Sequence, residues 1–121
     1  MRKLAAIFAL VAFAPLQAHA GERSLSGAQI KALLPGVIVK GEGTSQVFSA
    51  SGGTTFTDHG RDSFGSWTVV AERYCSKWPP GETRACYTVI VDDAPPDGGT
   101  AIIIWTSEDG NKSTNTFSAK E

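Results

Sequence analysis

The stretch "RYCSKWPPGETRACYTVIV", Arg73–Val91, contains both cysteines of this 121-residue chain. Cys75 lies late in one run of strand-forming residues, and Cys86 lies at the start of the next. Pro79–Gly81, between them, is a turn signal. A hairpin over this stretch would bring the two cysteines side by side. The sequence therefore predicts two antiparallel strands joined by a disulfide, within a fold that is mainly β.

The first twenty residues, "MRKLAAIFALVAFAPLQAHA", have the pattern of a secretory signal peptide. Arg2 and Lys3 form a charged start, an apolar run follows, and Ala18–Ala20 ends it with a small-x-small cleavage site. The run is short for a membrane span, which needs about 20 apolar residues. The sequence predicts cleavage after residue 20, a periplasmic or secreted product, and no membrane association after cleavage.

The remaining segment, residues 21–121, is expected to form one small domain, because 101 residues can bury a single modest core. It carries 9 basic and 12 acidic residues and no run of three basic residues. Binding to nucleic acid needs a positive patch, so nucleic acid is not expected as a partner.

Two other roles for the cysteines do not suit this pattern. Redox exchange usually uses a Cys-x-x-Cys motif at a helix start, which lowers the thiol pKa. A structural zinc site needs four ligands, and residues 21–121 offer Cys75, Cys86 and the single histidine His59. In an exported domain of this size, two such cysteines are expected to be oxidised, and the cross-link should contribute about 3 kcal/mol.

A short helix is expected over residues 26–34, followed by strands. Ser26 and Gln29 fit a capping box, and Ile30, Leu33 and Leu34 form an apolar stripe. From residue 37 the chain is rich in β-branched and aromatic residues, interrupted by Gly, Pro, Asp and Ser. The expected strands are at about 37–41, 45–50, 53–57, 64–70, 73–78, 85–92, 100–106 and 113–118.

Short connections between these strands favour an antiparallel meander, expected to close as an eight-stranded barrel that is lipocalin-like in miniature. A two-layer sandwich is the alternative. The run "AIIIWT" at 101–106 is apolar on both faces, so Ile102 and Ile104 would point outward. The N-terminal helix is expected to cover them, and a homodimer interface through these two residues is the other possibility.

The aromatic residues of Trp and Tyr type lie on four successive expected strands. They pack a small β core in one interpretation, and in the other they line a ligand cavity or a partner surface. The chain is small for a roomy ligand barrel, which favours the core. The candidate binding residues are Trp67, Tyr74, Trp78, Tyr87 and Trp105.

Neither catalysis nor a cofactor is predicted. His59 follows Asp58 in "TDHGRD", but no serine has the context of a nucleophile, and the stretch is typical of a turn. Asp92, Asp93 and Asp97 lack the spacing of a calcium loop, so a solvated turn is expected there.

The pattern as a whole resembles small exported proteobacterial proteins of unknown function. They share a leading "L-S/T-G-x-x-I-x-x-L-L-x-G" helix and a "G-x-W-x-V-x-x-x-x-x-C-x-x-W…C-Y" hairpin, matched here by "LSGAQIKALLPG" and by "GSWTVVAERYCSKW" with "ACY". The resemblance covers most of residues 21–121. It implies an antiparallel periplasmic β fold in which the motif residues are framework: Trp67, Cys75, Trp78, Cys86 and Tyr87.

The chain is also similar, more faintly, to periplasmic lysozyme inhibitors of the small-barrel type. Their inhibitory loops carry a serine-glycine pair and a lysine, for which "SASGG" and "CSKW" are the counterparts here. The expected function is therefore a non-enzymatic exported β-domain that binds a protein partner or a small apolar ligand. The alternative is an inhibitor of a cell-wall hydrolase.

Overall fold

The protein is a closed, eight-stranded antiparallel β-barrel with one short helix. The computed structural model describes residues 21–93 and 99–120. The predicted signal peptide and Asp97 lie outside these residues. The barrel strands are β2 (Val37–Gly41), β3 (Thr44–Phe48), β4 (Gly53–Asp58), β5 (Arg61–Val70), β6 (Arg73–Lys77), β7 (Ala85–Asp92), β8 (Ile102–Ser107) and β9 (Lys112–Ala119).

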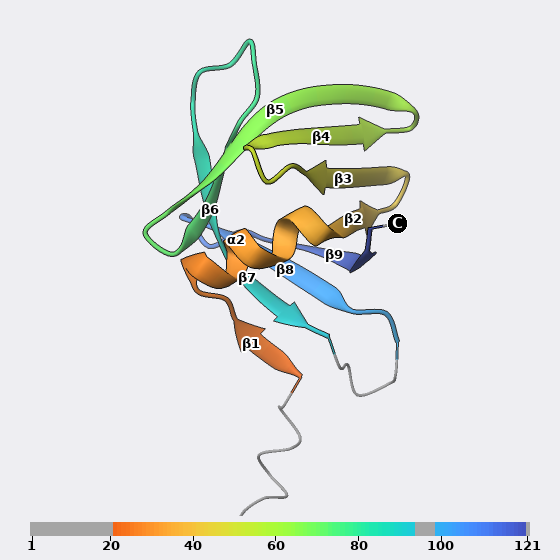
Figure 1. Ribbon diagram of the computed structural model, residues 1–121, viewed down its shortest axis with the longest axis vertical. Coiled ribbons are helices and arrows are strands. Elements are labelled where there is room, and N and C mark those ends of the chain that lie inside the picture. The colour runs from red at the N-terminus through yellow and green to blue at the C-terminus, as the bar shows by residue number, and fades with distance from the viewer. Residues whose placement is uncertain (1–20, 94–98, 121) are drawn as a thin grey trace, which may run out of the picture.

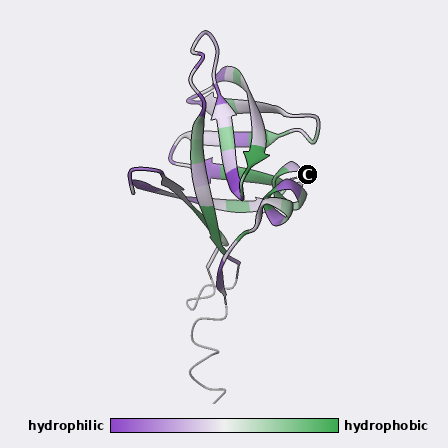
Figure 2. Cartoon of the chain, turned by 90° about the vertical axis from the view of Figure 1, so that its left-hand side faces the viewer, coloured by the Kyte–Doolittle hydropathy of each residue, from purple (hydrophilic) through white to green (hydrophobic). Residues whose placement is uncertain are grey.

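The barrel closes because each strand pairs with its sequence neighbour and β9 pairs back onto β2. Figure 1 shows this meander, and Figure 2, turned by 90°, shows the strands wrapping around a common interior. Because the barrel is closed, each of its eight strands pairs with one neighbour on each side. A ninth strand, β1 (Glu22–Ser24), pairs with the end of β7 at Ile90–Asp92, beyond the part of β7 that pairs with β6.

The connection between β4 and β5 is tighter than the sequence suggested. The predicted loop over residues 58–62 is a two-residue turn, in which His59 and Gly60 both have positive φ and Asp58 pairs with Arg61. Two left-handed residues match the twist of a β-hairpin, so β5 starts at Arg61 rather than near residue 64.

The helix α2 (Gly27–Leu33) begins with the predicted capping box. The Ser26 hydroxyl accepts from the Gln29 amide, and the Gln29 side chain accepts from the Ser26 amide. Glu72, in the β5–β6 turn, adds a second anchor, because its carboxylate accepts a hydrogen bond of 2.6 Å from the Gly27 amide. The 3₁₀ turn η1 (Leu34–Gly36) then leads directly into β2.

The helix closes one end of the barrel. Its Ile30 and the following Leu34 are completely buried and belong to the same core as Phe48, Val91 and Ile103. The helix packs against β5 and β6, and η1 packs against β3. An apolar floor therefore seals the barrel at the end where β3 and β7 finish.

This position corrects one prediction. Ile102 and Ile104 do point outward, as expected, but the apolar residues of the helix are used inside the barrel. Ile102 and Ile104 stay partly exposed on the outer face, and Ile104 pairs with Ile90 of β7. Glu22–Ser24, before the predicted helix, form the additional strand β1.

The disulfide between Cys75 and Cys86 is present, as predicted. The two cysteines are direct partners in the register of β6 and β7. Cys75 is completely buried, and its neighbours Tyr74 and Ser76 point to the opposite face, into the barrel. The cross-link therefore fixes two strands whose inward side chains form part of the barrel interior.

Candidate functional site

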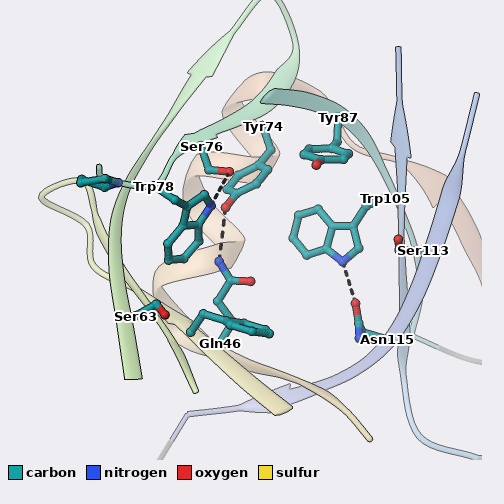
Figure 3. A pocket seen from close by; sticks show the side chains of 11 residues that line it. Gln46, Ser63, Tyr74, Ser76, Trp78, Tyr87, Trp105, Ser113 and Asn115 are labelled. Atoms are coloured by element: carbon teal, nitrogen blue, oxygen red, sulfur yellow. Dashed lines mark hydrogen bonds between the residues drawn. The ribbon is translucent and has the colours of Figure 1, made fainter. Parts of the chain in front are cut away.

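A pocket occupies the end of the barrel opposite the helix. It has a volume of about 460 Å³ and lies inside the ring of strands, beside the β4–β5, β6–β7 and β8–β9 connections. In Figure 3, which looks into the pocket, the helix lies behind the lining side chains. Those side chains come from β3 to β9 and the residues that follow β6: Gln46, Phe56, Ser63, Tyr74, Ser76, Trp78, Pro79, Tyr87, Trp105, Ser113 and Asn115.

The base of the pocket is a layer of packed aromatic rings. Tyr74 and Trp105 lie with ring centroids 5.0 Å apart, and Phe48 lies 5.8 Å from Tyr74 and 6.3 Å from Trp105. Tyr87 extends this layer at 6.3 Å from Tyr74. These separations are those of favourable ring pairs, so the layer is a rigid, preformed base that separates the pocket from the helix-side core.

Trp78 forms a side wall of the pocket because Gly65 leaves space for it. A Cβ atom on Gly65 would lie 2.7 Å from Cε3 of the Trp78 ring and 2.6 Å from the Lys77 carbonyl oxygen. The Trp78 indole donates a hydrogen bond of 3.2 Å to the Ser76 hydroxyl and packs edge-on to Phe56. Figure 3 shows Trp78 and Trp105 on opposite sides of the open space.

The hydrogen bonds fix how two side-chain amides are oriented. The Trp105 indole can only donate, so its 3.0 Å contact with Asn115 sets the Asn115 oxygen as the acceptor. The Thr54 hydroxyl gives its single proton to the Val47 carbonyl, so it can only accept from Gln46. The Gln46 amide nitrogen therefore faces Thr54 and also Tyr74, at 3.0 and 3.3 Å.

One consequence of this orientation is a fixed acceptor in the pocket. The Gln46 carbonyl oxygen has no hydrogen-bond partner among the described residues, and Figure 3 shows it directed toward the space between Trp78 and Trp105. A ligand can accept or donate at a hydroxyl, but at this oxygen it can only donate.

The pocket contains no charged side chain among its eleven lining residues. Burial raises the pKa of Tyr74 above its usual value, an effect partly opposed by its hydrogen bonds to Ser76 and Gln46. Tyr74 is therefore neutral at physiological pH. A charged group placed in this pocket would lose its hydration without gaining an opposite charge, so the pocket suits an uncharged ligand.

Four of the five predicted binding residues line the pocket, and the fifth does not. Tyr74, Trp78, Tyr87 and Trp105 are brought together by β6, β7, β8 and the residue after β6. Trp67 is buried in the core instead, stacks on Tyr74, and donates from its indole to the Ser49 carbonyl at 2.9 Å. Trp67 therefore belongs to the core alone, whereas Tyr74 and Trp105 are core residues that also line the pocket.

The polar half of the pocket was missed from the sequence. The alternation of side chains along a strand could have identified it. Phe48, Trp67 and Phe117 are buried, so every second residue before each of them on β3, β5 and β9 also points into the barrel. Those positions include Gln46, Ser63, Ser113 and Asn115, which gave no signal by composition alone.

The histidine lies outside the pocket. His59 sits at the tip of the β4–β5 hairpin with 77 % of its side chain exposed, and its Nδ1 lies 2.6 Å from the Asp58 carboxylate. Its ring packs over Gly43 of the neighbouring turn. Within residues 21–93 and 99–120, no three His, Cys, Asp or Glu side chains are grouped so that they could hold a metal ion.

Comparisons with known proteins identify no relative. No protein-family model matches the chain, and neither a curated protein nor a solved structure matches it. The site must therefore be interpreted from its own chemistry. In the described part of the chain, no helix has the length and hydropathy needed to span a bilayer. The disulfide fits a location outside the reducing cytosol.

Proposed function

We propose that the protein is a non-enzymatic, exported binding domain, periplasmic or secreted, that holds a small and largely apolar ligand in the barrel pocket. The observation that carries this proposal is a preformed, charge-free pocket of about 460 Å³ walled by five aromatic rings. Its volume lies within the usual range of about 300–1,000 Å³ for small-molecule sites.

Packing supports this use of the pocket. Phe48 and Trp67 are buried in the core, where they contribute to stability. Here Tyr87, Trp78 and Phe56 keep partly exposed faces in a concave space. Apolar surface of that kind is stabilised when a ligand displaces water from it.

The proposal can be tested by native mass spectrometry of protein purified gently from the exported fraction of its own host. We expect a fraction of the molecules to carry an extra small-molecule mass. The variant Ser113→Phe places a ring at the mouth of the pocket and should lose that mass. Thr114→Phe on the same strand points outward and should keep it. Bare protein in all three samples, or equal retention in both variants, would contradict the proposal.

A second candidate function is inhibition of a cell-wall hydrolase. The register supports it, because Gly53 of the "SASGG" segment is opposite Ser66, which is opposite Lys77. The serine-glycine turn and the lysine are thus two strands apart, roughly 10 Å at normal strand spacing. Ser51 and Lys77 are both exposed. A lysozyme inhibition assay tests this candidate, and inhibition that survives Ser51→Ala with Lys77→Ala would exclude these loops.

A further inference from the structure

The chemistry of the pocket also indicates the class of ligand. We infer that the ligand is a neutral, planar ring compound with an N–H or O–H donor on its edge, which pairs with the Gln46 carbonyl oxygen. This inference rests on the proposed function, because it concerns the occupant of the same pocket.

We infer that the ligand is neutral because the pocket lining is uncharged. Every polar side-chain group of the lining is a hydroxyl, an amide or an indole N–H, and none carries a charge. A carboxylate or ammonium group of the ligand would be buried with no opposite charge, which costs far more than such hydrogen bonds return.

A ring shape follows from the arrangement of the aromatic side chains. The indoles of Trp78 and Trp105 stand on opposite sides of the space, and Tyr74 and Tyr87 of the aromatic base lie next to each other (Figure 3). Aromatic faces and edges interact best with other rings, at separations of 4.5–7 Å. A flexible alkyl chain gains only dispersion from such walls and loses rotamer freedom when it is bound.

The N–H or O–H donor on the edge of the ligand is inferred from the Gln46 carbonyl oxygen. Its amide nitrogen is committed to Thr54 and Tyr74, so the oxygen that faces the space cannot rotate away without breaking both bonds. A ligand without a donor would remove water from this oxygen and leave it unpaired, which is costly for a partly buried polar atom. A lactam or imide edge provides the N–H that this oxygen requires.

Three probes of defined chemistry test the inference. Quinazoline-2,4-dione is neutral and has two fused rings with N–H donors. Naphthalene has two fused rings and no donor, and decan-1-ol is a neutral chain. Binding is followed by NMR of the three indole N–H signals, because the chain has three tryptophans. Trp78 and Trp105 line the pocket, whereas Trp67 lies outside it and serves as an internal reference.

The expected result is that quinazoline-2,4-dione shifts the Trp78 and Trp105 signals and binds about tenfold more tightly than naphthalene, the value of one good hydrogen bond. Decan-1-ol should bind more weakly than both. Gln46→Met keeps the length of the side chain and should abolish the tenfold preference. Thr54→Val removes a Gln46 partner but keeps the Gln46 oxygen, and should retain most of the preference.

The other outcomes separate the two proposals. If naphthalene or decan-1-ol binds as tightly as the dione, or if Gln46→Met keeps the preference, the inferred ligand class is wrong and the pocket remains a binding site. If none of the three probes moves the Trp78 and Trp105 signals at their solubility limits, both the ligand class and the proposed function are refuted.

Discussion

Reduction of the Cys75–Cys86 disulfide should cost about 3 kcal/mol of folding free energy and leave the barrel folded. The bridge joins positions 11 residues apart, so it closes a loop of about 12 residues in the unfolded chain. The loop-entropy relation gives about 2.8 kcal/mol for such a loop at 25 °C. A domain of about 100 residues has roughly 5–15 kcal/mol of stability, so most of that range leaves a folded protein after reduction.

The cross-link and the packing can be separated by three samples. Urea unfolding of the oxidised and reduced wild-type protein isolates the cross-link, because both keep the buried sulfur of Cys75. With a urea m-value of about 2 kcal/mol/M, the midpoint should fall by about 1.4 M. The double variant Cys75→Ala with Cys86→Ala also removes the buried sulfur of Cys75. It should be less stable than the reduced wild type by about 1 kcal/mol, the value for a group of methylene size.

The reasoning would be refuted by a reduced wild-type protein within 1 kcal/mol of the oxidised one. That result would mean that the unfolded chain already holds the β6–β7 hairpin together, so the bridge removes little entropy. A reduced protein that is fully unfolded would refute it in the other direction. It would show that closure of the barrel depends on the bridge and is not secured by strand pairing alone.

Three further perturbations test how the helix and the pocket are held. Glu72→Ala removes the acceptor of the Gly27 amide and should destabilise the protein by about 1 kcal/mol, whereas Glu72→Gln should cost less in the same urea titration. Gly65→Ala should cost about 1–3 kcal/mol and expose Trp78, seen as a red shift of its fluorescence, while Gly53→Ala, which has open space, should cost less. Burial raises the pKa of Tyr74 in the folded protein above its unfolded value near 10. The contribution of Tyr74 to folding stability is therefore complete below pH 10 and is lost as the pH rises through the folded pKa. The wild type should lose stability above pH 10 more steeply than Tyr74→Phe in the same urea titration.

Local signals made most of the fold predictable. The capping box at Ser26 and the turn that contains Pro79–Gly81 depend only on residues a few positions apart. From β6 onward, Tyr74, Ser76 and Trp78 alternate with Cys75 and Lys77, and the first three line the pocket. Each of these features is fixed by the periodicity of a strand or by one turn, so neighbouring residues contain the information.

Features that depend on contacts between distant segments were not predictable. β1 has three exposed residues and no apolar alternation, and it forms only because the end of β7 has a free edge. The apolar stripe of the helix showed that it needed a partner, but not whether this was the outer face of β8 or the open end of the barrel. Likewise, Trp67 and Trp105 have the same composition signal and are both buried in the core, and only their position along the barrel decides that Trp105 also lines the pocket and Trp67 does not.

The small size of the chain favoured a packed aromatic core over a roomy ligand barrel, and the structure shows a pocket of about 460 Å³ beside that core. The number of strands sets the circumference of a barrel, and eight strands are enough for one small ligand whatever their length. Short strands reduce the depth instead. Because α2 supplies the apolar floor from outside the strands, the strands need only one ring layer, around Phe48, between that floor and the pocket. The remaining length of β3 to β9 is then available as a shallow cup, which suits a small planar ligand better than a long chain.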